Sequence, residues 1–193
     1  MPERRRVPVK PARPKPSFSA ADFKEAVQLA REPDSSECSC PRLDAAEWHE
    51  VESDWSDIAF VRTSMNAVMG VPVGFAGVKA ELAMKALKAG AEVPEDAMLL
   101  LGEGKMRRPV MLEVEGAQPG SRDLERPGGV AYTRIVPAPM GGMKKAVRET
   151  RSLAAQKYGR EPDALWIWYL TCRVCSGPRE FETLILAHYK SRS

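Results

Sequence analysis

Two stretches of this chain repeat the same order of predicted elements, and the repeat limits the folds that the chain can adopt. The first stretch starts with the β-branched and apolar segment 60–71, which is typical of a strand. An amphipathic helical pattern follows over 74–89 and stops at Gly90. The segments 97–102 and 109–117 then predict two strands joined by a hairpin loop.

The second stretch has the same order, strand, helix, strand, strand. Residues 129–136 predict a strand, and residues 140–158 predict a helix with one apolar stripe that Gly159 ends. Two further strands are predicted over 165–172 and 181–189. An internal repeat of this size is too long for a solenoid unit and favours two related modules in one domain.

The repeat predicts an α+β fold built from two βαββ modules in a pseudo-two-fold arrangement. The modules are the halves 60–117 and 129–190 of a domain over 60–193, and the segment 118–128 links them. We expect both helices on one face of the sheet and a groove on the other face. A groove at the junction of two halves is where small-molecule sites tend to lie.

The N-terminal part differs in composition from the rest. Residues 1–18 are basic and proline-rich, which predicts a disordered tail. Residues 19–59 predict a short helix over 19–31 and then an irregular segment, which Trp48 and Trp55 would anchor to the core.

Charge and hydropathy exclude several classes of protein. The net charge is +3, and the first 17 residues alone carry six Lys or Arg against one Glu, so about −2 remains on the folded part. We therefore expect no nucleic-acid-binding body, apart from weak contact by the tail. No apolar run approaches the roughly 20 residues of a membrane span, so we expect a cytoplasmic protein without membrane contact. We expect a monomer or a homodimer.

Strand alternation sorts side chains between the two faces of the sheet. In 165–172, Trp166 and Trp168 share one face, where flat and rigid rings suit the wall of a pocket, although plain core packing is the alternative. Glu113 shares a face with Met111, where the simplest interpretation of the carboxylate is a solvated strand face. The other residues that alternation places as candidates in their strands are Tyr132, Glu182 and His188.

Four cysteines form two pairs, Cys38 with Cys40 and Cys172 with Cys175. In a cytosolic protein such pairs indicate a zinc site, buried thiols or redox chemistry before disulfides. In an extended chain the two thiols of a CxC pair lie roughly 6–7 Å apart, which is awkward for one tetrahedral ion. We therefore expect no metal and no cofactor, with thiols packed beneath Trp48 or Trp55.

Familiar catalytic motifs are absent from the chain. It has no HExxH, no GxGxxG and no glycine-rich phosphate loop, and no Ser-His-Asp order points to a triad. Sequence motifs alone therefore give no support to conventional hydrolase, nucleotide-binding or metalloprotease functions.

Several segments carry a resemblance to a known family. The repeated βαββ order, CPRLDAAEWHEVESDWSDIAFVR (40–62), VPVGFAGV (71–78) and WYLTCRVC (168–175) resemble the gyrase-inhibitor-like (GyrI-like) small-molecule-binding proteins. They are similar in particular to the branch with cyclopropanoid cyclopropyl hydrolases. Some members of that branch open the reactive cyclopropane of DNA-alkylating natural products inside an aromatic cage. The resemblance implies self-protection or detoxification, with sequestration of a drug or an effector-binding regulatory module as the alternatives.

The resemblance also implies roles for individual residues. Trp166 and Trp168 would stack on an apolar aromatic ligand, and either Tyr132 or Tyr169 would hydrogen-bond its carbonyl or the attacking water. A carboxylate would orient that water. The residues assigned on this basis are Tyr132, Tyr169, Glu113 and Glu182 for catalysis and Trp166, Trp168, Phe75, Met69, Met111 and His188 for ligand binding.

Overall fold

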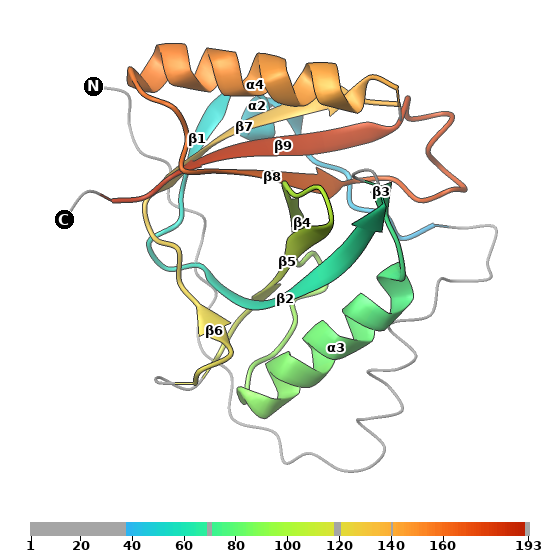
Figure 1. Ribbon diagram of the computed structural model, residues 1–193, viewed down its shortest axis with the longest axis vertical. Coiled ribbons are helices and arrows are strands. Elements are labelled where there is room, and N and C mark those ends of the chain that lie inside the picture. Colours follow the sequence, from blue (N-terminus) through green and yellow to red (C-terminus); the bar gives the residue numbers. More distant parts are fainter. Residues whose placement is uncertain (1–37, 69–70, 118–120, 140, 192–193) are drawn as a thin grey trace.

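A single curled antiparallel sheet forms the body of the protein in the computed structural model, which describes residues 38–68, 71–117, 121–139 and 141–191 (Figure 1). Its strand order is β1-β7-β9-β8-β4-β5-β2-β3, and β6 pairs with β2 outside this path. The tail 1–18, the predicted helix 19–31 and Met69 lie outside the described residues. No helix in the described part of the chain is long and apolar enough to cross a membrane.

Both halves contain the predicted order of strand, helix, strand, strand, so the α+β class is confirmed. The first half comprises β2 (Ala59–Val68), β3 (Val71–Pro72), α3 (Phe75–Lys88), β4 (Leu99–Gly102) and β5 (Arg107–Val114). The second comprises β7 (Val130–Pro137), α4 (Met143–Tyr158), β8 (Ala164–Tyr169) and β9 (Glu182–Tyr189). The pairing of β4 with β8 joins the halves into one sheet. A pseudo-two-fold relation between them stays a prediction.

The helices end where the glycines predicted. Gly90 follows α3 with φ +62°, and Gly159 caps α4 with φ +66°. These left-handed conformations favour glycine because it has no Cβ.

Both helices pack on the same face of the sheet. Val78, Leu82 and Ala86 of α3 are buried in a cluster with Leu101 of β4. Ala146 and Ala154 of α4 are buried in a second cluster with Leu165 of β8. Leu101 lies opposite Ile167, which shares its face with Leu165, so the two clusters lie on one side of the sheet. In Figure 1 the helices flank the outside of the curl. We call the opposite, concave side the inner face.

Two segments expected to be irregular contribute strands. The segment before β2 contains the short helix α2 (Ala45–Trp48), capped by Asp44, and β1 (Val51–Asp54), which pairs with β7. The linker 118–128 contains β6 (Leu124–Glu125), which pairs with β2. Neither strand has the apolar alternation that predicts a strand, because β6 has only two residues and three of the four residues of β1 are polar.

Candidate functional site

An aromatic cluster fills the inner face of the sheet. Trp166 and Trp168 of β8 both point to this face, as alternation predicted. The buried members of the cluster are Trp55, Phe60, Met98, Leu100, Met111, Ala131, Trp166, Trp168, Leu170, Leu184 and Leu186. Trp166 and Trp168 are only 6% and 5% exposed, so the rings belong to the core and do not form the wall of an open groove. This burial corrects the expectation of a partly open inner face.

The N-terminal segment covers this cluster. The rings of Trp48 and Trp168 meet edge to face, with centroids 6.2 Å apart. Trp55 is 1% exposed, and its ring centroid lies 5.3 Å from that of Phe60 and 4.8 Å from that of His188. The prediction that both tryptophans anchor the segment to the core is therefore confirmed.

Glu113 places a carboxylate at the margin of the cluster. On β5 it lies opposite Phe60 of β2 and shares its face with the buried Met111. It is half-buried, and its Oε2 accepts a hydrogen bond from the Met98 N–H at 3.0 Å. Burial raises the pKa of the Glu113 carboxyl above its ordinary value, against the opposing effect of that hydrogen bond. A carboxyl with a raised pKa beside apolar rings is a candidate general base or acid.

Arg62 lies on the same face beside Glu113, and the sequence reasoning missed it. It is opposite Met111 in the β2 and β5 pairing, which makes it a diagonal neighbour of Glu113 at roughly 7–8 Å. Its guanidinium bonds Glu125 of β6 at 3.0 Å. Only the pairing of β2 with β5 brings the arginine and the glutamate together, so no local motif could have revealed them.

His188 lies beneath Trp55 and is 2% exposed. Its Nε2 donates a hydrogen bond to the Gly128 carbonyl at 2.7 Å, so that nitrogen is already engaged. Burial lowers the pKa of His188, which favours the neutral ring. The residue therefore lies within the core beside the aromatic cluster, and its engaged nitrogen faces the backbone.

Glu182 points to the inner face at the start of β9 but is bound by an arginine. Its carboxylate lies 2.5 Å from Arg179 Nη2, and the same guanidinium donates to the carbonyls of Leu170 at 2.9 Å and Pro41 at 2.8 Å. Arg179 thus joins the N-terminal segment to the turn before β9. This engagement favours a structural role for Glu182.

Three of the predicted site residues lie away from the inner face. Tyr132 is buried in the α4 cluster with Lys157 over its ring at 4.9 Å, so it faces the helices. Tyr169 is exposed and alternates with Trp168, which places it on the helix side. Phe75 begins α3 and is also exposed. These placements correct the expectation that the three residues line the groove.

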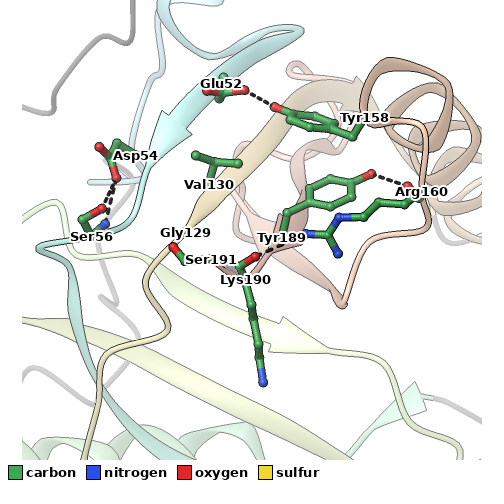
Figure 2. Close-up of a pocket in the computed structure, with 10 residues that line it drawn as sticks. All are labelled: Glu52, Asp54, Ser56, Gly129, Val130, Tyr158, Arg160, Tyr189, Lys190 and Ser191. Atoms are coloured by element: carbon green, nitrogen blue, oxygen red, sulfur yellow. Dashed lines mark hydrogen bonds between the residues drawn. The ribbon is translucent and has the colours of Figure 1, made fainter. Parts of the chain in front are cut away.

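A separate polar pocket of about 260 Å³ opens between β1, the end of α4 and the end of β9 (Figure 2). Its lining residues are Glu52, Asp54, Ser56, Gly129, Val130, Tyr158, Arg160, Tyr189, Lys190 and Ser191, none of which was predicted. Tyr158 donates to Glu52, Asp54 accepts from Ser56, and Tyr189 donates to the Arg160 carbonyl. The bond between Tyr158 and Glu52 joins the end of α4 to β1 across the pocket.

The four cysteines come together where the segment before α2 meets the turn after β8. Their sulfur atoms all lie within 4.8 Å of one another. Residues 38–40 lie outside any strand, so the spacing of an extended CxC pair does not apply to them. This convergence corrects the geometric argument against a shared site. Hydrogen bonds from the N–H groups of Cys175 and Val174 lower the pKa of Cys172 to about 7.

The chain was compared with known proteins. Comparison with curated proteins gave no match. A family model described as bacterial hydrolase matches residues 30–182, which include β1 to β8 and both long helices. Because this match covers most of the chain, the protein belongs to the bacterial hydrolase family.

Proposed function

We propose that this protein hydrolyses a reactive apolar electrophile, with Glu113 as the general base. The observation that carries the proposal is the half-buried Glu113 carboxyl, whose pKa burial raises, at the margin of the aromatic cluster. Membership of the bacterial hydrolase family supports a hydrolytic reaction. The substrate class follows from the resemblance to cyclopropyl hydrolases.

The reaction can be written for a cyclopropane conjugated to a dienone. Glu113 accepts a proton from water as the water oxygen bonds the ring carbon. The cyclopropane carbon–carbon bond breaks, and its electron pair passes through the dienone to the carbonyl oxygen, which becomes a phenolate. Arg62 would stabilise this negative charge, and the proton held by Glu113 then returns to give the phenol. The sum is the addition of one water.

A flat substrate needs apolar contact next to these two charged groups. Met111 and Phe60 lie beside Glu113 and Arg62 in the strand pairing, but both are fully buried, so they would supply that contact only after the cover of the cluster moves. Stacking on Trp166 or Trp168 would require Trp48 or Trp55 to move, since these rings cover the cluster. We therefore propose that the substrate binds at the margin first.

The test is incubation with a duocarmycin-type cyclopropane compound, followed by mass measurement of the compound. We expect a protein-dependent gain of one water. Glu113→Gln should lower the rate about 100-fold or more, which is the usual contribution of a general base. Glu149→Gln, an exposed glutamate of α4 on the helix side of the sheet, is the control and should keep the wild-type rate. An equal rate in wild type and Glu113→Gln would overturn the role of Glu113.

Sequestration without catalysis is the second candidate. It is favoured by the placement of Tyr132 and Tyr169 away from the inner face, which leaves few groups for acid-base chemistry there. In the same assay, sequestration predicts protection of the compound at stoichiometric protein with no change of mass. An effector-binding regulatory module would give the same result and would also need a partner protein.

A further inference from the structure

Two segments far apart in the sequence bring four thiols to one point. Cys38 and Cys40 precede α2, and Cys172 and Cys175 lie in the turn after β8. The four sulfur atoms all lie within 4.8 Å of one another. The sulfur atoms of Cys172 and Cys175 are 4.0 Å apart.

The separations distinguish a metal site from a disulfide. Sulfur atoms in a disulfide lie about 2.0 Å apart. Four thiolates around a zinc ion, each at about 2.3 Å, lie roughly 3.8 Å from one another in a tetrahedron. The 4.0 Å between Cys172 Sγ and Cys175 Sγ is close to the second value, and no pair of sulfur atoms in the cluster exceeds that value by more than about 1 Å.

The turn that carries the second pair is shaped around its sulfur atoms. The Val174 N–H donates to Cys172 Sγ at 3.4 Å, and the Ser176 N–H donates to the Cys172 carbonyl at 2.9 Å. A backbone N–H that points at a sulfur stabilises a thiolate, which is the form that binds metal.

A buried cation lies next to the cluster. The Arg179 side chain is 11% exposed, and its Nη1 is 4.0 Å from Cys175 Sγ. Four thiolates and one divalent ion carry a net charge of about −2, which a neighbouring guanidinium partly offsets. Because Arg179 also bonds the Pro41 carbonyl, it links both cysteine pairs in the outer shell.

We propose that Cys38, Cys40, Cys172 and Cys175 bind one structural zinc ion as four thiolates. The thiols release four protons as the ion binds. Soft thiolates in a tetrahedron select zinc, and a site with all four positions taken by protein leaves none for water or substrate. The ion would fix residues 38–41 to the end of β8 and so hold Trp48 and Trp55 over the aromatic cluster.

The test begins with the wild-type full chain purified without chelator. Elemental analysis should find one zinc per chain, and a mercurial reagent should release it as four thiols react. Replacement by cobalt should give the thiolate charge-transfer and tetrahedral ligand-field bands. Iron in place of zinc would keep the ligand set but overturn the choice of metal. Wild-type protein that holds no metal after zinc is supplied, with four thiols free to react, would overturn the site.

Variants distinguish the cysteines that bind zinc from residues that only lie beside them. Cys40→Ser and Cys175→Ser should each lose most of the zinc, whereas Ser39→Ala, an exposed residue between two ligands, should keep it. Because a cysteine variant can fail to fold, the cobalt spectrum of the wild type decides independently. None of these readouts involves hydrolysis, so failure of the zinc site and failure of the proposed reaction are distinguishable.

Discussion

Trp48 of α2 and Trp168 of β8 meet edge to face, with ring planes 69° apart, although 119 positions separate them in the chain. Trp168 is buried at the centre of the aromatic cluster, and Trp48 is half-buried above it. The relationship shows that the N-terminal segment completes the core of the sheet.

Truncation of the two rings should have unequal costs. We expect Trp168→Ala to lower the free energy of unfolding by about 3–5 kcal/mol, because the ring leaves a cavity within a packed cluster. Trp48→Ala should cost less, since part of that ring is already in solvent. Urea unfolding of both variants measures the difference. Equal losses would mean that Trp48 contributes as much as the buried ring.

Gly102 provides a test of the packing around Trp166. A Cβ at this position would lie 2.5 Å from Pro109 Cγ and 2.9 Å from Trp166 Cζ3. Gly102→Ala should therefore cost about 1–3 kcal/mol of unfolding free energy and change the near-ultraviolet circular dichroism of the tryptophans. Gly141→Ala, where a Cβ meets nothing within 4 Å, is the control and should leave the spectrum unchanged.

The raised pKa of Glu113 predicts a pH-dependent stability. The folded protein holds this proton more tightly than the unfolded chain does, so the contribution is present below about pH 4, the ordinary range for Glu, and is lost as pH rises through the raised pKa. Wild type should therefore lose unfolding free energy relative to Glu113→Gln between acid and neutral pH. Denaturant unfolding of both proteins across that range measures the change. A constant difference would contradict the shift.

His188 should titrate below its ordinary value of 6.5, because burial lowers its pKa. The sign is opposite to that of Glu113. The contribution to stability is present above 6.5 and is lost as pH falls through the lowered folded pKa. The chain has two histidines, so a His49→Asn variant assigns the remaining ring signals in an NMR titration. Protonation of His188 at or above 6.5 would contradict its burial as the dominant effect.

Arg179 should matter more than an exposed cation. Arg179→Met removes hydrogen bonds to the Leu170 and Pro41 carbonyls and leaves Glu182 without its partner. We expect a loss of about 2–4 kcal/mol in thermal or urea unfolding. Lys145→Met removes an exposed pair with Glu149 and should cost about 0.5 kcal/mol or less. Similar losses in the two variants would argue against the bridging role of Arg179.

The order of elements could be predicted because it depends on local signals. Alternation in 165–172 placed Trp166 and Trp168 on the correct face, and Gly90 and Gly159 marked the helix ends. The burial of the two tryptophans could not be predicted, since it depends on the N-terminal segment, which joins the core only through long-range packing.

The site was less predictable than the fold for the same physical reason. Alternation gives the face of a residue but not the side on which the helices pack, so it could not show that Tyr132, which the resemblance implied as a catalytic residue, faces the helices. The neighbourhood of Arg62 and Glu113 depends on the register between β2 and β5. The convergence of the cysteines depends on how a segment without regular structure crosses the end of β8.

The edge strands of the sheet limit pairing with strands of other molecules. Among the described strands, β1 forms one edge with four residues, and β3 and β6, with two residues each, pair with different parts of β2 at the other edge. β1 carries Glu52 and Asp54, and β3 ends in Pro72, which has no N–H to donate. Long, flat and apolar edges recruit strands from other molecules, whereas short, charged or proline-bearing edges discourage such pairing. β1, which lines the pocket beside the end of α4, therefore also protects its own edge of the sheet from edge-to-edge aggregation.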